Sequence, residues 1–143
     1  MQRRLCLIML SLLPLLAGAP AAAADDGLYR AWGGKDGIRA VMEDFVARLQ
    51  ADARTAPFFK ESNRRHLVAQ LTDQLCQEAG GPCVYEGVPM RQAHAELEIG
   101  RRDFNALVEL LQQSMDAKAI PFAAQNGMLA RLAPLHRQIV TRD

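Results

Sequence analysis

The chain has no excess of charge of either sign. Its 143 residues contain 17 lysines and arginines against 16 aspartates and glutamates, which gives a formal net charge of +1 at pH 7. A surface that binds nucleic acid or an anionic membrane needs concentrated positive charge, so neither partner is expected. The sequence also lacks repeats and convincing alternating apolar–polar runs. These absences argue against a repeat architecture and against half-buried β-strands.

The first 24 residues differ in composition from the rest. They comprise a basic start at Arg3 and Arg4, an apolar run over residues 5–16 and a tail of small residues over 17–24. This order is typical of a secretory signal peptide. The apolar run is shorter than the roughly 20 residues that span a bilayer, which argues against a membrane anchor.

Cleavage after Ala24 would leave a single mature domain over residues 25–143. Without Arg3 and Arg4 this domain has 15 basic and 16 acidic side chains. Cys6 lies near the start of the apolar run, a poor position for a lipoprotein cysteine, so we expect no membrane attachment after cleavage. Export to a bacterial periplasm is the localisation that we expect. The arginine pair leaves both the general secretory and the twin-arginine routes open.

The mature chain shows four stripes of apolar residues at helical spacing. They run over residues 38–49, 67–75, 104–115 and 128–140. Gly80, Gly81 and Pro82 follow the second stripe and predict its end, while Pro134 predicts a kink or break in the fourth. The pattern predicts an all-α domain, for which a simple four-helix bundle is one solution.

One histidine stands in a fifth, shorter pattern over residues 88–99. Met90, Ala93, Leu97 and Ile99 recur at about helical spacing and place His94 beside an apolar face. A neutral imidazole in such a position can bind a metal, although a lone histidine beside a core stripe is more often hydrogen-bonded or half-exposed. Both interpretations stay open on the pattern alone.

Several short motifs occur together in a fixed order. They are Tyr29, Gly33-Gly34, Glu43-Asp44-Phe45, Ala56-Pro57-Phe58-Phe59, Gly80-Gly81-Pro82, Tyr85, Gly87, Met90 and His94. In order and spacing this set resembles the group 1 truncated haemoglobin family, from about Leu28 to Val140. The resemblance implies a globin-like two-over-two helical sandwich around a haem, with the first globin helix nearly absent.

The same resemblance implies roles for individual residues. His94 corresponds to the proximal haem iron ligand, and Phe59 to the haem-packing phenylalanine. Phe58 and Met90 correspond to wall residues, and Tyr85 to a residue that fixes the loop or meets a haem propionate. Core packing remains an alternative role for these four. The chain has no Cys-x-x-Cys-His motif, which excludes c-type attachment and implies haem b as cofactor.

The distal side departs from the family pattern. Val46 stands where many relatives have tyrosine, and Leu71 where a glutamine is common. With Leu67 and Leu75 at the same helical spacing, the strip facing the iron is expected to be apolar and to lack the usual donors to dioxygen. The remaining polar residues nearby either face solvent or turn inward as substitutes: His66, Gln70 and Gln74.

Two further pairings are predicted. Cys76 and Cys83 survive signal cleavage and flank the Gly-Gly-Pro reversal, so in an exported protein we expect them to form a disulfide. His136 falls where some cyanobacterial relatives link a histidine covalently to a haem vinyl group, and its other interpretation is a surface histidine in a fraying helix.

The function that the sequence predicts is reversible binding of oxygen, carbon monoxide or nitric oxide at haem iron held by His94. One alternative is a haem enzyme that removes nitric oxide or peroxide, which would require a polar distal group or a partner reductase of unknown identity. The other is a helical interaction module that has lost haem.

Overall fold

The structure is a computed structural model that describes residues 25–142. The predicted signal peptide, residues 1–24, lies outside the described residues. Within them the helices are α1 (Gly27–Ala31), α2 (Gly34–Ala51), α3 (Ala56–Phe59), α4 (Arg64–Glu78), α5 (Met90–His94), α6 (Arg101–Ala117), α7 (Phe122–Leu132) and α8 (His136–Ile139), with a 3-10 turn η1 (Ala133–Leu135) between the last two.

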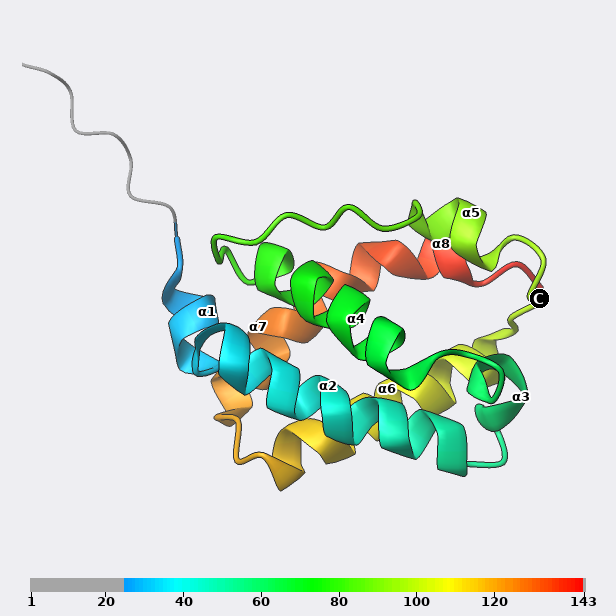
Figure 1. Cartoon of the computed structure of the whole chain (residues 1–143), viewed down its shortest axis with the longest axis horizontal. Helices are drawn as coiled ribbons and strands as arrows, with labels where there is room; N and C mark the ends of the chain where they lie inside the picture. Colours follow the sequence, from blue (N-terminus) through cyan, green and yellow to red (C-terminus); the bar gives the residue numbers. More distant parts are fainter. Residues whose placement is uncertain (1–24, 143) are drawn as a thin grey trace, which may run out of the picture.

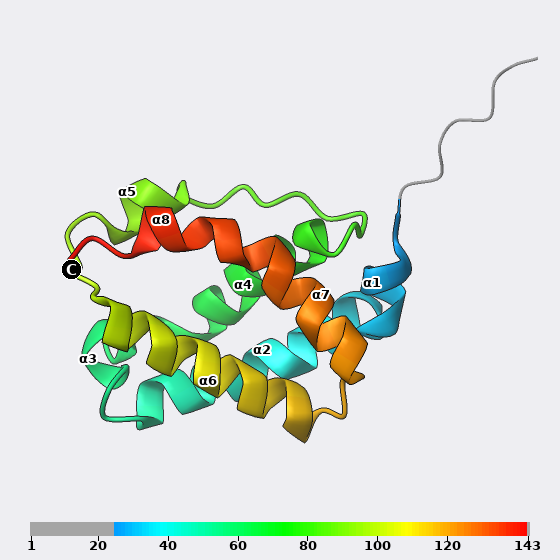
Figure 2. The same ribbon diagram turned by 180° about the vertical axis from the view of Figure 1, so that it is seen from behind.

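The long helices form two layers. Helices α2 and α4 lie in one layer, and α6 and α7 lie behind them in the other (Figures 1 and 2). The apolar faces of these helices meet in one core, whose fully buried members include Ile38, Val41, Met42, Met115 and Met128. This is the predicted two-over-two sandwich. Its four apolar stripes are those read from the sequence.

Predicted helix ends also agree with the structure. Gly80 follows α4 with a φ of 80°, a left-handed conformation that glycine adopts without steric cost. Pro134 lies in η1, which separates α7 from α8, so the predicted break in the fourth stripe is present. The short α1 is the only helix before Gly33 in the described residues, in line with a nearly absent first globin helix.

The apolar pattern over residues 88–99 is helical only in its first part. Helix α5 ends at His94, Ala93 and Leu97 are exposed, and Glu98 has a φ of 48°. Further on, the chain pairs with its own C-terminal end: the carbonyl of Ile99 accepts hydrogen bonds from the backbone N–H groups of Thr141 and Arg142, at 2.9 and 3.1 Å. Ile99 is 8% exposed and lies outside α5.

Candidate functional site

His94 is the last residue of a helix of little more than one turn. Helix α5 lies beside α8, and the two pack against each other (Figures 1 and 2). The preceding segment, residues 79–89, runs from the end of α4 to α5 without regular structure. Pro89 precedes the first residue of α5 in an extended conformation, so the helix starts sharply at Met90.

The hydrogen bond of His94 fixes the chemistry of its ring. Nδ1 lies 2.7 Å from the carbonyl oxygen of Met90. A carbonyl can only accept, so Nδ1 donates, and in the neutral ring this leaves the lone pair on Nε2. Within residues 25–142 no hydrogen bond occupies Nε2. A half-buried neutral imidazole oriented in this way is the form in which histidine ligates a metal.

Half-buried apolar side chains occur on the elements around α5 and α8. They are Phe58 and Phe59 on α3, Leu67 and Leu71 on α4, Phe104, Leu107 and Val108 on α6, and Ile139 on α8. Phe59, Leu67, Leu71 and Leu107 also pack against the core. Both views show α3, the start of α6 and the α5–α8 pair at the same end of the molecule (Figures 1 and 2). An apolar group bound there would cover surface that is otherwise half in water.

Two predicted pocket residues are more deeply buried. Val46 on α2 is fully buried, and Leu75 near the end of α4 is 4% exposed. Both belong to the main core, together with the residues packed on α2. Of the side chains predicted for the distal strip, Val46 and Leu75 are thus core members, and Leu67 and Leu71 are partly buried against that core, whereas His66 is exposed at the start of α4.

Gln74 is buried, which contradicts the interpretation that it faces solvent. It is 8% exposed, and its Nε2 donates to the Sδ of Met90 at 3.7 Å. Gln70 is half-buried. Its side-chain oxygen lies close to Gly87, where an added Cβ would collide with it. Both contacts were missed from the sequence because a glutamine on a helix flank resembles a solvated residue.

Tyr85 fixes the segment that precedes α5. Its N–H donates to Oε1 of Gln77 at 2.8 Å, and its hydroxyl donates to the carbonyl of Val88 at 3.0 Å. Burial raises the pKa of the Tyr85 hydroxyl, so it stays protonated and remains a donor. Of the two predicted roles, the structure displays the loop-fixing one.

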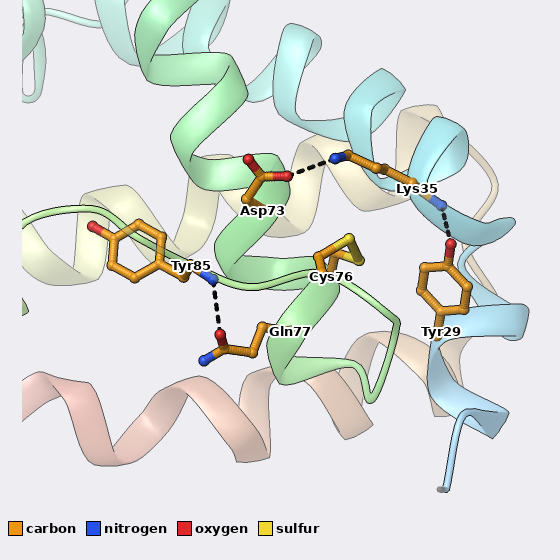
Figure 3. The surroundings of a disulfide bond; sticks show 7 residues. Tyr29, Lys35, Asp73, Cys76, Gln77 and Tyr85 are labelled. Atoms are coloured by element: carbon orange, nitrogen blue, oxygen red, sulfur yellow. Dashed lines mark hydrogen bonds and ion pairs between the residues drawn. A yellow bond between two sulfur atoms is a disulfide. The ribbon is translucent and has the colours of Figure 1, made fainter.

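Cys76 and Cys83 are joined as a disulfide, as expected (Figure 3). Their Cα atoms are 5.7 Å apart, within the range that disulfides require. Cys76 is fully buried on α4, and Cys83 lies in the segment that leads to α5. The bond therefore fastens that segment to the core.

His136 is half-buried at the start of α8. Its ring meets the ring of Phe104 edge to face, with centroids 4.7 Å apart. The interpretation as a surface residue of a fraying end does not describe this packed position.

The protein groups present suit a cofactor that brings most of its own ligands. Among the described residues no group of three or more His, Cys, Asp and Glu could hold a bare metal ion. One free Nε2 and an apolar surround instead fit a metal macrocycle with a single protein ligand.

No helix within residues 25–142 is long and apolar enough to cross a membrane.

A surface hollow of about 700 Å³ lies elsewhere, beside α1 and the end of α4. Its lining includes Asp26, Tyr29 and Gly80, and it does not include His94. It therefore belongs to a different part of the molecule from the candidate site.

Fold and site together define a small globin, a class of haem protein. Residues 27–141 match the family model of bacterial-like globins, and the chain belongs to this family. It is 29% identical over 116 residues to the group 1 truncated hemoglobin GlbN of Mycolicibacterium paratuberculosis, covering 81% of this chain and 85% of that protein.

Solved structures agree with this assignment. The truncated hemoglobin of Tetrahymena pyriformis in its Fe(III) form superposes with a TM-score of 0.75 at 26% identity, covering 79% of this chain and 97% of that one. The 2/2 hemoglobin of Synechococcus sp. PCC 7002, solved in the cyanomet state with covalently attached heme, gives 0.75 at 21% identity, covering 80% and 98%, and supports the fold alone. The globin family implies a haem cofactor, and the donor and apolar side chains described above fit one.

Proposed function

We propose that this chain is an exported haem b protein that reversibly binds a diatomic gas, with His94 as the proximal iron ligand. The observation that carries the proposal is the Nδ1 hydrogen bond of His94 to the Met90 carbonyl, which leaves Nε2 free to bind iron. The absence of a Cys-x-x-Cys-His motif favours haem b over a c-type group.

In this proposal His94 and the apolar side chains have different roles. His94 binds and orients the cofactor, and the apolar residues Phe58, Phe59, Leu67 and Leu71 exclude water from its faces. Haem iron supplies a coordination position for oxygen, carbon monoxide or nitric oxide. Val46 and Leu71 present no hydrogen-bond donor there.

The apolar distal side favours ligands that need no hydrogen bond. Bound dioxygen gains about 1.5 to 3 kcal/mol from each charge-assisted donor, while carbon monoxide gains much less. We therefore expect a low ratio of oxygen to carbon monoxide affinity, fast oxygen dissociation and rapid oxidation to the ferric form. Stopped-flow measurement of the dissociation rates checks this expectation.

Export rests on the sequence of residues 1–24, and the disulfide supports it. Disulfides persist in oxidising compartments such as the bacterial periplasm. N-terminal sequencing of protein from a periplasmic fraction should begin at Asp25. Retention of residues 1–24 in cytoplasmic protein would contradict export.

The experiment that tests the central assignment is His94→Ala. We expect the variant to lose haem on gel filtration, or to hold it weakly until imidazole is added, because the proposed protein ligand of the iron is removed. An unchanged Soret band and an unchanged axial electron paramagnetic resonance signal would contradict the role of His94. His66→Ala, which removes an exposed histidine of α4, is the matched control.

A covalent link between His136 and a haem vinyl group stays a prediction. Its half-buried ring at the start of α8 supports a place close to α5. The mass of the intact protein after acid–acetone extraction tests it. A gain equal to the mass of haem supports the link, and the polypeptide mass alone overturns it.

A further inference from the structure

Three glutamines follow one face of α4. Gln70, Gln74 and Gln77 are spaced i, i+4 and i+7, which places them above one another on the helix. All three side chains meet the stretch from Tyr85 to Met90. We call the three residues the glutamine ladder, and residues 79–89 the proximal loop.

The Gln77 contact holds the middle of the proximal loop. Its Oε1 accepts the backbone N–H of Tyr85, as Figure 3 shows, only two residues beyond the disulfide at Cys83. The proximal loop has no helical or strand partner for this N–H, so the side chain of Gln77 replaces one. The Tyr85 hydroxyl in turn donates to the carbonyl of Val88, so residues 86–88 turn back toward the Tyr85 ring.

The Gln70 contact is made at Gly87. A Cβ at Gly87 would collide with both the Tyr85 ring and the Gln70 side-chain oxygen. The absence of a side chain at Gly87 therefore leaves room for the ends of the Tyr85 and Gln70 side chains beside the loop backbone. A larger residue there would displace one or both of these side-chain ends.

The Gln74 contact reaches the helix that carries the histidine. Gln74 is more than nine-tenths buried, and among the described residues its amide has the Met90 thioether as its hydrogen-bond partner. A thioether sulfur is a weak acceptor, so the hydrogen bond that the buried Gln74 amide donates is a weak one. Met90 is also the residue whose carbonyl fixes Nδ1 of His94. One residue therefore joins the ladder to the imidazole.

We propose that the glutamine ladder positions His94 for iron, acting through the proximal loop and Met90. Its members are positioning residues, because none of them is required to touch the cofactor. The inference rests on the proposed role of His94 as iron ligand. The disulfide restrains the proximal loop close to α4. The ladder sets the position and rotation of α5 relative to α4.

Gln77→Met is the first test, because it keeps the side-chain length and removes the acceptor. In ferric protein we expect haem transfer to excess apomyoglobin to speed up by about two- to tenfold, the range that loss of one hydrogen bond gives. In the haem-free protein the Tyr85 amide should exchange with deuterium faster by a similar factor. Gln77→Glu keeps an acceptor and should restore both. Gln112→Met, at an exposed position of α6 without a hydrogen bond in the described region, should change neither.

The second test separates positioning from general stability. In His94→Gly protein reconstituted with imidazole, the iron ligand is no longer attached to the chain. Gln74→Met and Gln77→Met should shift the iron–imidazole stretching band of the ferrous native protein, and should leave that band unchanged in the His94→Gly background. An equal shift in both backgrounds, or no shift in either, would overturn the ladder. Native haem ligation in His94→Gly without imidazole would instead overturn the proposed function.

Discussion

The two sides of this globin are held together by different means. The scaffold, formed by α2, α4, α6 and α7, buries continuous apolar faces, with Ile38, Met42 and Met128 fully buried. The proximal loop and α5 bury little: Val84 and Val88 are 69% and 51% exposed, and α5 is one short turn against α8. A disulfide and a few side-chain hydrogen bonds fasten this region to the scaffold. The fold therefore rests on hydrophobic burial, and the site rests on a few specific contacts.

The largest difference between the two sides should come from removing apolar volume. Met42→Ala empties a fully buried position and should lower the free energy of unfolding by about 2 to 5 kcal/mol. Val84→Ala removes an exposed side chain of the proximal loop and should change it by less than about 0.5 kcal/mol. Urea denaturation of the haem-free protein measures both. Equal effects would mean that the loop contributes to the core.

The disulfide should matter more to the proximal loop than to the scaffold. Replacing Cys76 and Cys83 together by alanine should cost about 2 to 3 kcal/mol at most in the chain-entropy model, because the closed loop is short. Amide exchange should rise over residues 79–89 and stay unchanged in α2 and α6. Unreduced native protein should contain no titratable thiol. Two titratable thiols, or uniform loss of protection, would contradict this view.

The same contrast explains what could be read from the sequence. The scaffold was predictable because long stripes such as Ile38 to Leu49 repeat the helical period and leave few other ways to bury that surface. The Gly80 turn and the Pro134 break were predictable because each residue restricts the backbone locally. These features depend on neighbours in the chain.

The proximal region depends on distant partners, which a local pattern does not contain. Beyond His94 the chain leaves the helix, and the carbonyl of Ile99 pairs with the chain end, a contact that the local apolar spacing does not contain. Gln74 was expected to face solvent or turn inward, and the structure buries it beside Met90, whereas Gln77 is exposed and still accepts from the Tyr85 N–H. Their spacing with Gln70 was the available signal, since a solvated helix face has no need of three identical amides in register.

A smaller effect, on the rate of oxygen dissociation, should come from substitutions at Val46, the scaffold residue predicted for the distal strip. Val46→Tyr introduces a donor, and Val46→Phe introduces nearly the same volume without one. We expect oxygen to dissociate about tenfold to a hundredfold more slowly from the tyrosine variant than from the phenylalanine variant. Both substitutions enlarge a fully buried side chain, so both should cost about 1 to 3 kcal/mol of stability. Equal dissociation rates, or slow native release that Gln70→Ala or Gln74→Ala accelerates, would contradict the apolar distal side.

The smallest effect is a dependence of stability on pH, which we expect for a contact of the scaffold and not for the anchors of the proximal loop. Hydrogen bonds from the side chain and backbone of Arg54 hold the pKa of Asp52 at about 2, below its ordinary value of 3.8, and Arg54 also pairs with Glu109 on α6. Because the folded pKa is the lower one, this contact stabilises the scaffold above pH 3.8 and is lost as pH falls toward 2.

Asp52→Asn should therefore lower the thermal midpoint slightly at pH 6, and the difference from the native protein should shrink between pH 4 and pH 2. High salt should reduce it too, since the pair is exposed. The anchors of the proximal loop carry no charge, because they are glutamine amides and a disulfide. Deuterium exchange of the Tyr85 amide, corrected for its intrinsic pH dependence, should stay constant over the upper part of that window, while the protein remains folded. A difference in thermal midpoint that does not vary with pH would remove Asp52 as the cause.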